Sequence, residues 1–351
     1  MSNMEVLKII KKLYETENAS YDEILYLLKS SEDELVRKEL FKYSGEVTEK
    51  SFGKKIYIRG LIEYSNICKN DCYYCGIRKS NENLQRYRLS KEEILTSCEN
   101  GYRLGFRTFV LQGGDDGYFT DDYVCGIIEE IKKRYPECAL TLSMGERDYD
   151  SYKRFYEKGA NRYLLRHESI NSNHYSLLHP ENMSLEKRIE CLKSLKEIGY
   201  QTGCGFMVGS PYQTIENIAE DIMFIKEFSP HMIGVGPFIS HKDTPFCDFE
   251  NGSYKLTVFI IGILRLMNPK ALIPSTTALN SIAKAGRIEG IKAGANVIMP
   301  NLSPFDVRDK YSLYNGKLST GIEGGESIEA LKDELKKEGF ILSMERGDYK
   351  N

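Results

Sequence analysis

The sequence predicts an α/β fold: a (β/α)8 barrel of the TIM type with an N-terminal helical extension and a C-terminal helix. Eight short runs rich in β-branched or apolar residues follow one another after residue 50, a pattern typical of buried parallel strands. Helix-like stretches separate these runs, and several end in glycine just before the next run, as at Gly105 and Gly199. A chain of 351 residues is long enough to close such a barrel as one unit.

The predicted elements divide the chain into three parts. Residues 1–50 read as a helical extension, with helices at 4–14, 21–28 and 32–44. Residues 51–322 form the predicted barrel, and residues 323–351 a last helix and tail. The eight predicted strands are 56–65, 108–114, 139–145, 162–168, 202–209, 231–237, 271–277 and 295–301. Ser90 and Glu93 form a capping box at the start of the first intervening helix. Repeated β-then-α units favour parallel strands with right-handed crossovers, and a doubly wound open sheet is the alternative.

Composition narrows the class of protein. With 41% hydrophobic and 28% charged residues, the chain resembles soluble globular proteins with a full core. The net charge of −3 gives no reason to expect nucleic acid or an anionic membrane as a partner. The most apolar run, residues 256–267, is too short to span a bilayer and contains Arg265, so we expect a buried helix. No signal peptide is apparent, and nine cysteines, an odd number, predict the reducing cytoplasm.

Three of the cysteines are clustered. Cys68, Cys72 and Cys75 begin three residues after the first predicted strand ends, at the end of a barrel where catalytic groups lie. A structural zinc site needs four ligands, and no histidine is near in sequence. A [4Fe–4S] cluster held by three cysteines leaves one iron open, and that iron can chelate the amino and carboxylate groups of S-adenosylmethionine (SAM). Zinc or a plain electron-transfer site are the alternatives.

With Tyr74 directly before the last cysteine, this spacing resembles the radical SAM superfamily. The resemblance implies reductive cleavage of SAM to methionine and a 5′-deoxyadenosyl radical, which the protein must shield from water. The "QGGDD" turn at 112–116 matches a glycine-rich turn whose backbone accepts the methionine amino group, where glycine permits close approach. The "VGSPYQT" turn at 208–214 could cradle the adenosine in a similar way.

Several phrases between residues 52 and 314, among them "NRYLLRHES", "PSTTAL" and "GANVIMPNLSP", together resemble the HydE family of [FeFe]-hydrogenase maturases. The resemblance implies that SAM is contacted by Tyr74, Gln112, Gly113, Gly114, Glu168, Arg188 and Met207. It implies a pocket for a carboxylate-bearing, cysteine-derived iron complex formed by Arg166, Thr276, Thr277, Ala278, Tyr311 and Tyr314. The partners it implies are the maturases HydG and HydF and a reductant protein.

The residues themselves support part of this assignment. Arg166 and Glu168 share one parity on the fourth predicted strand and therefore point to the same side. Two charges aimed into a barrel mouth are unfavourable unless they bind something polar, and a mutual ion pair at the rim is the alternative. His167 has the opposite parity, so we expect it to face a helix and not to act as a ligand.

The chain departs from some relatives. No cysteine follows Cys247, which excludes a second cluster in the tail. The turn reads Gln-Gly-Gly-Asp-Asp where relatives have Gln-Ser-Gly-Glu-Asp, and His179 stands where they have arginine. Rival functions are a carbon-skeleton mutase such as methylornithine synthase, biotin synthase, and a non-catalytic iron–sulfur carrier or sensor. Biotin synthase needs additional cysteines inside the barrel, and strand parity directs Cys204 and Cys138 outward.

Overall fold

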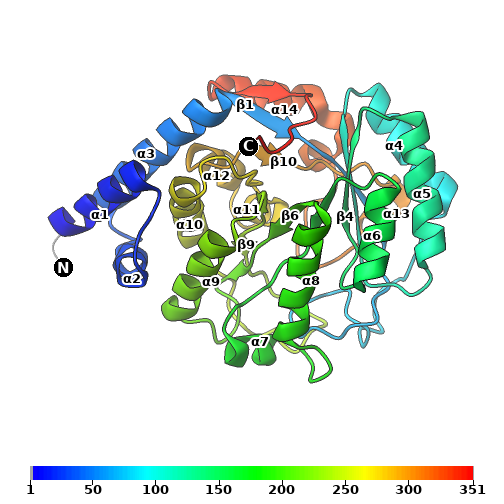
Figure 1. Cartoon of the computed structure of the whole chain (residues 1–351), viewed down its shortest axis with the longest axis horizontal. Helices are drawn as coiled ribbons and strands as arrows, with labels where there is room; N and C mark the ends of the chain where they lie inside the picture. Colours follow the sequence, from blue (N-terminus) through cyan, green and yellow to red (C-terminus); the bar gives the residue numbers. More distant parts are fainter. Residues whose placement is uncertain (1–2, 351) are drawn as a thin grey trace.

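The computed structural model describes residues 3–350 and has an α/β fold built on parallel strands (Figure 1). Its largest sheet has six strands in the order β2-β3-β4-β5-β6-β8, all paired in parallel. These strands are β2 (Gly60–Ser65), β3 (Thr108–Gly113), β4 (Ala139–Ser143), β5 (Arg162–Leu164), β6 (Gln201–Cys204) and β8 (Met232–Ile233). Each falls within or one residue outside a predicted strand, so the parallel α/β expectation is confirmed.

Single bridges continue the pairing beyond β8. Met232 pairs with Leu272, and Pro274 pairs with Val297, so the seventh predicted strand is present as two isolated parallel bridges. Val297 belongs to β10 (Val297–Ile298), which pairs with β1 (Lys55–Ile58). A further bridge joins Leu61 of β2 to Asn301. The parallel pairings therefore run from β2 through every predicted strand in order and return to β2.

The first predicted strand is divided at Arg59. Its first half, β1, pairs with β10 and with β11 (Ile341–Ser343), whereas its second half, β2, pairs with β3. The strand changes neighbours along its length, which is the stagger expected when a sheet curls round on itself. β11 was not predicted, because three residues with an exposed Ile341 carry no alternating pattern. β7 (Met207–Val208) and β9 (Gly236–Pro237) pair with each other in a separate two-stranded parallel sheet. In the chain, β7 follows β6 and β9 follows β8.

Helices follow most strands. They are α4 (Lys91–Arg103), α5 (Asp121–Arg134), α6 (Tyr149–Glu157), α7 (Ser172–Leu178), α8 (Leu185–Ile198), α9 (Ile215–Phe228), α10 (Tyr254–Met267), α11 (Thr277–Ile282), α12 (Gly286–Lys292), α13 (Phe305–Arg308) and α14 (Ile328–Lys337). The capping box of Ser90 and Glu93 is present at α4. Gly105 and Gly199 have φ values of 99° and 106°, a backbone region that favours glycine, and end their helices as predicted.

The N-terminal helices α1 (Asn3–Thr16), α2 (Tyr21–Lys29) and α3 (Glu34–Phe52) lie together at one side of the molecule (Figure 1). They are attached through α3, which packs on α10, and through α2, which packs on α9. The third helix extends well beyond the predicted residue 44 and reaches Phe52, where Gly53 ends it with a φ of 62°. Val47 and Thr48, beyond the predicted end, are buried like Val36 and Leu40 before it, so the helix keeps one buried face through its additional turns.

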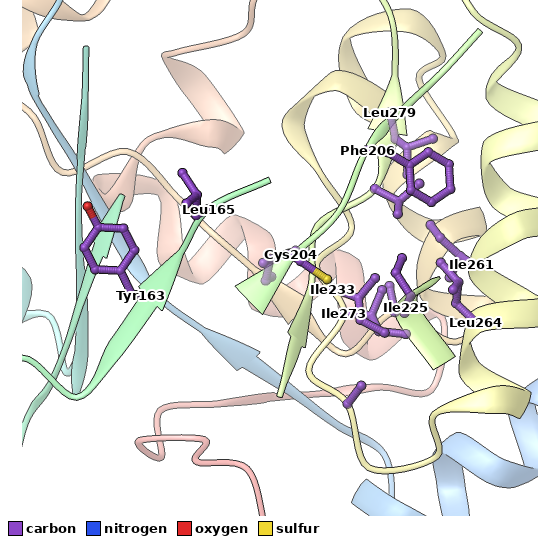
Figure 2. Packing of buried hydrophobic residues seen from close by; sticks show 14 of the residues in the cluster. Tyr163, Leu165, Cys204, Phe206, Ile225, Ile233, Ile261, Leu264, Ile273 and Leu279 are labelled. Carbon is purple, nitrogen blue, oxygen red and sulfur yellow. The ribbon is translucent and has the colours of Figure 1, made fainter. Parts of the chain in front are cut away.

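The core lies between the strands and the helices that cover them. α10 is buried along almost its whole length, and its Arg265 donates to the carbonyls of Gly294, Pro269 and Ala271. The apolar run therefore forms a buried helix, as predicted. Figure 2 shows the sulfur of Cys204 directed toward the group of buried residues that contains Ile233 and Ile225. Among the helices of residues 3–350, none combines the length and the apolar character needed to cross a membrane.

Candidate active site

A cavity of about 310 Å³ opens at the carboxyl ends of the strands. It brings together nearly all the predicted site residues: Cys68, Cys72, Tyr74, Cys75, Gln112, Gly113, Gly114, Arg166, Glu168, Arg188, Met207, Thr276, Ala278, Tyr311 and Tyr314 line it. These residues come from segments up to 246 positions apart in sequence, from Cys68 to Tyr314, and a cavity of this size suits a small-molecule ligand. The fold therefore gathers the separate parts of the predicted site around one cavity, and their roles stay predictions.

Partly buried charged side chains hold the cysteine loop between β2 and α4. Arg86, which follows the cysteines in sequence, donates to the carbonyls of Asn66, Ile77 and Arg78 at 2.6–2.9 Å. Asp71 accepts two hydrogen bonds from Arg78, at 2.7 and 2.5 Å. Hydrogen bonds to charged groups contribute about 1.5–3 kcal/mol each, so these contacts fix the loop in the absence of regular secondary structure.

The three thiols of this loop are partly buried and face the same cavity. Burial raises the pKa of the Cys68 thiol, raises that of Cys72 to about 12 and raises that of Cys75 further. At neutral pH the thiols are therefore protonated until a metal displaces their protons. The backbone N–H of Asp115 donates to Cys68 Sγ at 3.4 Å, a contact that also favours a thiolate at that position.

The donor set is compatible with the cluster that the sequence predicts. Three cysteine thiols from one loop line the same cavity, none of them is in a disulfide, and cysteine thiolates are the usual ligands of iron–sulfur clusters.

The Gln112–Asp116 turn is tied to the cysteine loop at several points. A Cβ placed on Gly114 would lie 2.1 Å from Ile67 O and 2.9 Å from Cys68 Cβ, so only glycine allows the two segments to approach this closely. Asp116 accepts hydrogen bonds from Arg88 at 2.7 and 3.0 Å and from the Ser65 hydroxyl at 2.7 Å. The acidic end of the turn thus anchors it, while its glycines face the cavity.

Arg166 and Glu168 form the ion pair that was the alternative to ligand binding, with Nη2 of Arg166 at 2.7 Å from Oε2 of Glu168. Both nevertheless line the cavity. Arg166 Nε and Thr276 Oγ1 are buried and have no hydrogen-bond partner in the described part of the chain. Glu168 also has a φ of 65°, an unfavourable backbone region for a non-glycine residue and a feature that clusters at ligand sites. The pair therefore retains hydrogen-bonding capacity for a polar ligand.

Arg188 is held by protein groups on two sides. Its Nε donates to Oε1 of Glu146 and its Nη1 to the carbonyl of Arg166, both at 2.5 Å. The sequence did not indicate Glu146 as a partner, because the two residues lie on different β–α connections. The Arg188 guanidinium is thus fixed at the cavity wall with a counter-charge on one edge.

Thr277 does not line this cavity, unlike its neighbours Thr276 and Ala278, and its predicted contact with the substrate stays a prediction. It is the first residue of α11 and lines a separate small pocket together with Arg287 and Glu323. Successive helical residues point about 100° apart, so one of these three neighbours is turned away from the cavity.

Two histidines take structural positions. His167 is fully buried; its Nδ1 accepts from the Gly205 N–H at 3.2 Å and its Nε2 lies 3.3 Å from Asp221 on α9. The prediction that it faces a helix is therefore confirmed. His179 hydrogen-bonds the Tyr175 carbonyl through Nδ1. Burial lowers the pKa of His179 to about 3, and the positive charge of nearby Arg188 is the second cause. Neutral His179 thus accepts a hydrogen bond from Tyr74 at 3.3 Å, and does not supply the positive charge of an arginine.

Several cavity residues were not predicted from the sequence. They include Asn70, Asp115, Ser143 and Met183. Met183 lies between α7 and α8, and its Sδ is 3.8 Å from Sγ of Cys72. Asp115 could have been found from its place in the "QGGDD" turn. Met183 lies in no recognisable motif, so only the folded chain brings it to the cysteines.

Comparison with known proteins decides the family. The Radical SAM superfamily model matches residues 62–225. The [FeFe] hydrogenase maturase subunit HydE of Thermotoga maritima is 43% identical over 296 residues, which are 84% of this chain and 84% of that protein. This chain belongs to the radical SAM superfamily. Membership in this superfamily makes the chain a radical SAM enzyme of HydE-like sequence, and implies a [4Fe–4S] cluster and SAM as cofactors.

Other radical SAM proteins share the fold. The 3-methylornithine synthase of Methanosarcina acetivorans is 30% identical over 85% of this chain and 84% of its own length. The crystal structure of methylornithine synthase (PylB) superposes with a TM-score of 0.84 at 25% identity, over 95% of this chain and 97% of that chain. The crystal structure of HydG gives 0.83 at 22% identity over 98% and 77%, a likeness of fold alone.

The additional cysteines that biotin synthase needs inside its barrel are not among the described residues that line the cavity, where the cysteines are Cys68, Cys72 and Cys75. Cys204 and Cys138 are buried and do not line it, in agreement with the predicted strand parity. All nine cysteines of the chain are free thiols.

Proposed function

We propose that this enzyme is a maturase for the active-site cluster of [FeFe]-hydrogenase. The observation that carries the proposal is the 43% identity to a HydE over 84% of both chains, against 30% to the 3-methylornithine synthases. The fold does not discriminate between these activities, because PylB and HydG superpose on it almost equally well. The retained cavity residues are the second support.

In this proposal Cys68, Cys72 and Cys75 hold the [4Fe–4S] cluster, and the fourth iron is left for SAM. When bound and reduced, the cluster supplies the electron that cleaves SAM to methionine and the 5′-deoxyadenosyl radical. SAM is contacted by Tyr74, Gln112, Gly113, Gly114, Glu168, Arg188 and Met207, all of which line the cavity. Glu168 accepts from the ribose hydroxyls and Arg188 donates to the methionine carboxylate, because their charges suit those groups.

The substrate in this proposal is a cysteine-derived iron complex that carries a carboxylate. Its proposed pocket consists of Arg166, Thr276, Thr277, Ala278, Tyr311 and Tyr314, and all of these except Thr277 line the cavity. The unpartnered Arg166 Nε and Thr276 Oγ1 support an anionic, hydrogen-bonding group at this wall, since buried polar atoms rarely go without a partner. The radical acts on a sulfur of this complex, and the cavity walls exclude water from it.

The architecture we propose is a (β/α)8 barrel in residues 51–322, with residues 1–50 as a helical extension and residues 323–351 as a C-terminal helix and tail. The ring of parallel pairings and single bridges from β2 back to Leu61 supports closure. We place the enzyme in the cytoplasm, because nine unpaired cysteines suit a reducing compartment. HydG, HydF and a reductant protein are the partners this role requires.

Complementation tests the maturase role. In a host that makes [FeFe]-hydrogenase but lacks its own HydE, expression of this chain should restore hydrogenase activity, and the Cys72→Ala variant should not. A host deficient in methylornithine synthase serves as the opposing test. Restoration of methylornithine synthesis without restoration of hydrogenase activity would replace the maturase proposal with the mutase.

A further inference from the structure

One segment of the chain lines the cavity and is hydrogen-bonded to two other segments beside it. Residues 309–320, here called the strap, connect α13 to the short 3-10 helix Gly321–Glu323. Tyr311, Leu313 and Tyr314 of the strap line the cavity. The Gly76 N–H of the cysteine loop donates to Leu313 O at 2.9 Å, and the Asn315 N–H donates to Ser240 O at 2.9 Å. The strap therefore joins the cysteine loop to the segment after β9 and covers the space between them.

The strap carries one lysine that is buried in the molecule. Lys317 Nζ lies 2.7 Å from Oε1 of Glu63, and the two side chains are 9% and 0% exposed. Asn301 Nδ2 donates to the other Glu63 oxygen at 2.8 Å. Glu63 lies on β2, directly opposite Gln112 of β3 in the sheet register. The lysine thus reaches from the strap to the strands that form the cavity wall.

Burial of such a pair is a poor source of stability. Desolvation of two charges offsets most of their attraction, and apolar residues of similar volume often stabilise a fold as well or better. Removing one partner alone, however, leaves a buried charge without compensation and is strongly unfavourable. The main effect of the pair is therefore to fix the position of the strap, and its net contribution to stability is small.

The same ammonium also contacts the cavity lining. Lys317 Nζ lies 5.2 Å from the centre of the Tyr311 ring, within the range of a cation–π interaction. Tyr311 is buried and lines the cavity. One lysine thus links Glu63 on β2 to an aromatic wall of the proposed substrate pocket.

Glycines on both sides of Lys317 allow this part of the strap to change conformation. Gly316 and Gly321 have φ values of 66° and 62°, and no heavy atom lies within 4 Å of the place a Cβ would take at either residue. Backbone in open space with a glycine-specific φ can absorb the dihedral changes of a hinge. The segment between them is fastened mainly through Lys317, apart from contacts of Leu318 and Ser319 with Ser281 and Asp309.

We propose that Lys317 is a positioning residue: its ion pair with Glu63 latches the strap over the cavity and holds Tyr311 against the substrate. Release of this pair frees the segment between the two glycines and withdraws the ammonium from the Tyr311 ring. The adjoining part of the strap, residues 311–315, is then held less firmly against the cavity, which admits or discharges the substrate. The substrate part of this inference rests on the proposed function of the pocket, whereas the latch itself does not.

Hydrogen–deuterium exchange of the reconstituted holoenzyme tests the latch without any substrate. Lys317→Met keeps the aliphatic stem and removes the charge, and Glu63→Gln removes the opposite charge. In both variants, exchange in the peptides that contain Gly76 and Asn315 should become at least about tenfold faster, while α5 exchanges as in the wild type. Lys317→Arg keeps the positive charge and should restore slow exchange at Asn315.

A matched control is Lys132→Met. Lys132 also donates to protein groups, the carbonyls of Pro136 and Cys138 at 2.8 and 2.6 Å, but lies at the end of α5, away from the strap. It should leave the strap peptides unchanged. Unchanged strap exchange in Lys317→Met, or an equal increase in α5, would overturn the latch. Failure of complementation by the wild type would instead remove the maturase role and leave the latch standing.

Discussion

Replacing Cys72 with alanine should reduce 5′-deoxyadenosine formation below detection. Cys72 lines the cavity together with Cys68 and Cys75. If one of the three thiolates is removed, two irons of the cluster lack a protein ligand and the cluster is bound less firmly. The measurement is 5′-deoxyadenosine release by the anaerobically reconstituted, dithionite-reduced protein, together with its iron content. Both quantities should fall in Cys72→Ala.

Cys247→Ala is the control for this experiment, because Cys247 is also a partly exposed free cysteine but does not line the cavity. It should retain iron and SAM cleavage at the wild-type level. Equal loss in both variants would indicate a general effect of cysteine removal, and full activity in Cys72→Ala would exclude that residue as a cluster ligand.

Replacing Gly114 with alanine should have the second largest effect. The added Cβ would lie 2.1 Å from the Ile67 carbonyl oxygen, a backbone atom next to Cys68, so the turn and the cysteine loop must move apart. Overpacking of this kind destabilises a fold by about 1–3 kcal/mol, and here it also displaces a cluster ligand. We expect a lower denaturant midpoint and a loss of SAM cleavage.

Gly117→Ala provides the matched control. It lies three residues after Gly114, directly beyond the turn, and nothing is within 4 Å of the place its Cβ would take. Wild-type stability and SAM cleavage are expected for this variant. Retention of SAM cleavage by Gly114→Ala would mean that the close approach of the two segments has no part in the chemistry.

The strand order was predictable because each strand carries a local apolar signal and the connections follow one hand. The seventh strand was overestimated: Leu272 and Pro274 form only single bridges, since proline cannot donate within a ladder. β11 was missed because its pairing with β1 depends on a tail that returns from the other end of the chain. The local sequence pattern does not show a pairing between strands that lie this far apart in the chain.

In the site, too, some features could be predicted from the local sequence and others depend on the tertiary fold. The cysteines and the glycine-rich turn were predictable because their chemistry demands particular residue types close together in sequence. A family phrase does not tell which residues at the start of a helix face the cavity, so it could not separate Thr277, which lines another pocket, from its neighbours. Lys317 looks in the sequence like a solvated lysine, and only the folded chain brings it to Glu63. The partner of a buried charge depends on the tertiary structure and is not visible in the local sequence.

Electron paramagnetic resonance of the reduced, reconstituted enzyme, recorded before and after addition of SAM, tests whether one iron of the cluster is open to SAM. We expect a [4Fe–4S]⁺ signal that changes when SAM is added, because an iron that no side chain occupies becomes coordinated by the amino and carboxylate groups of SAM. A signal that stays the same with SAM, or that reports a fourth side-chain ligand from the outset, would contradict it.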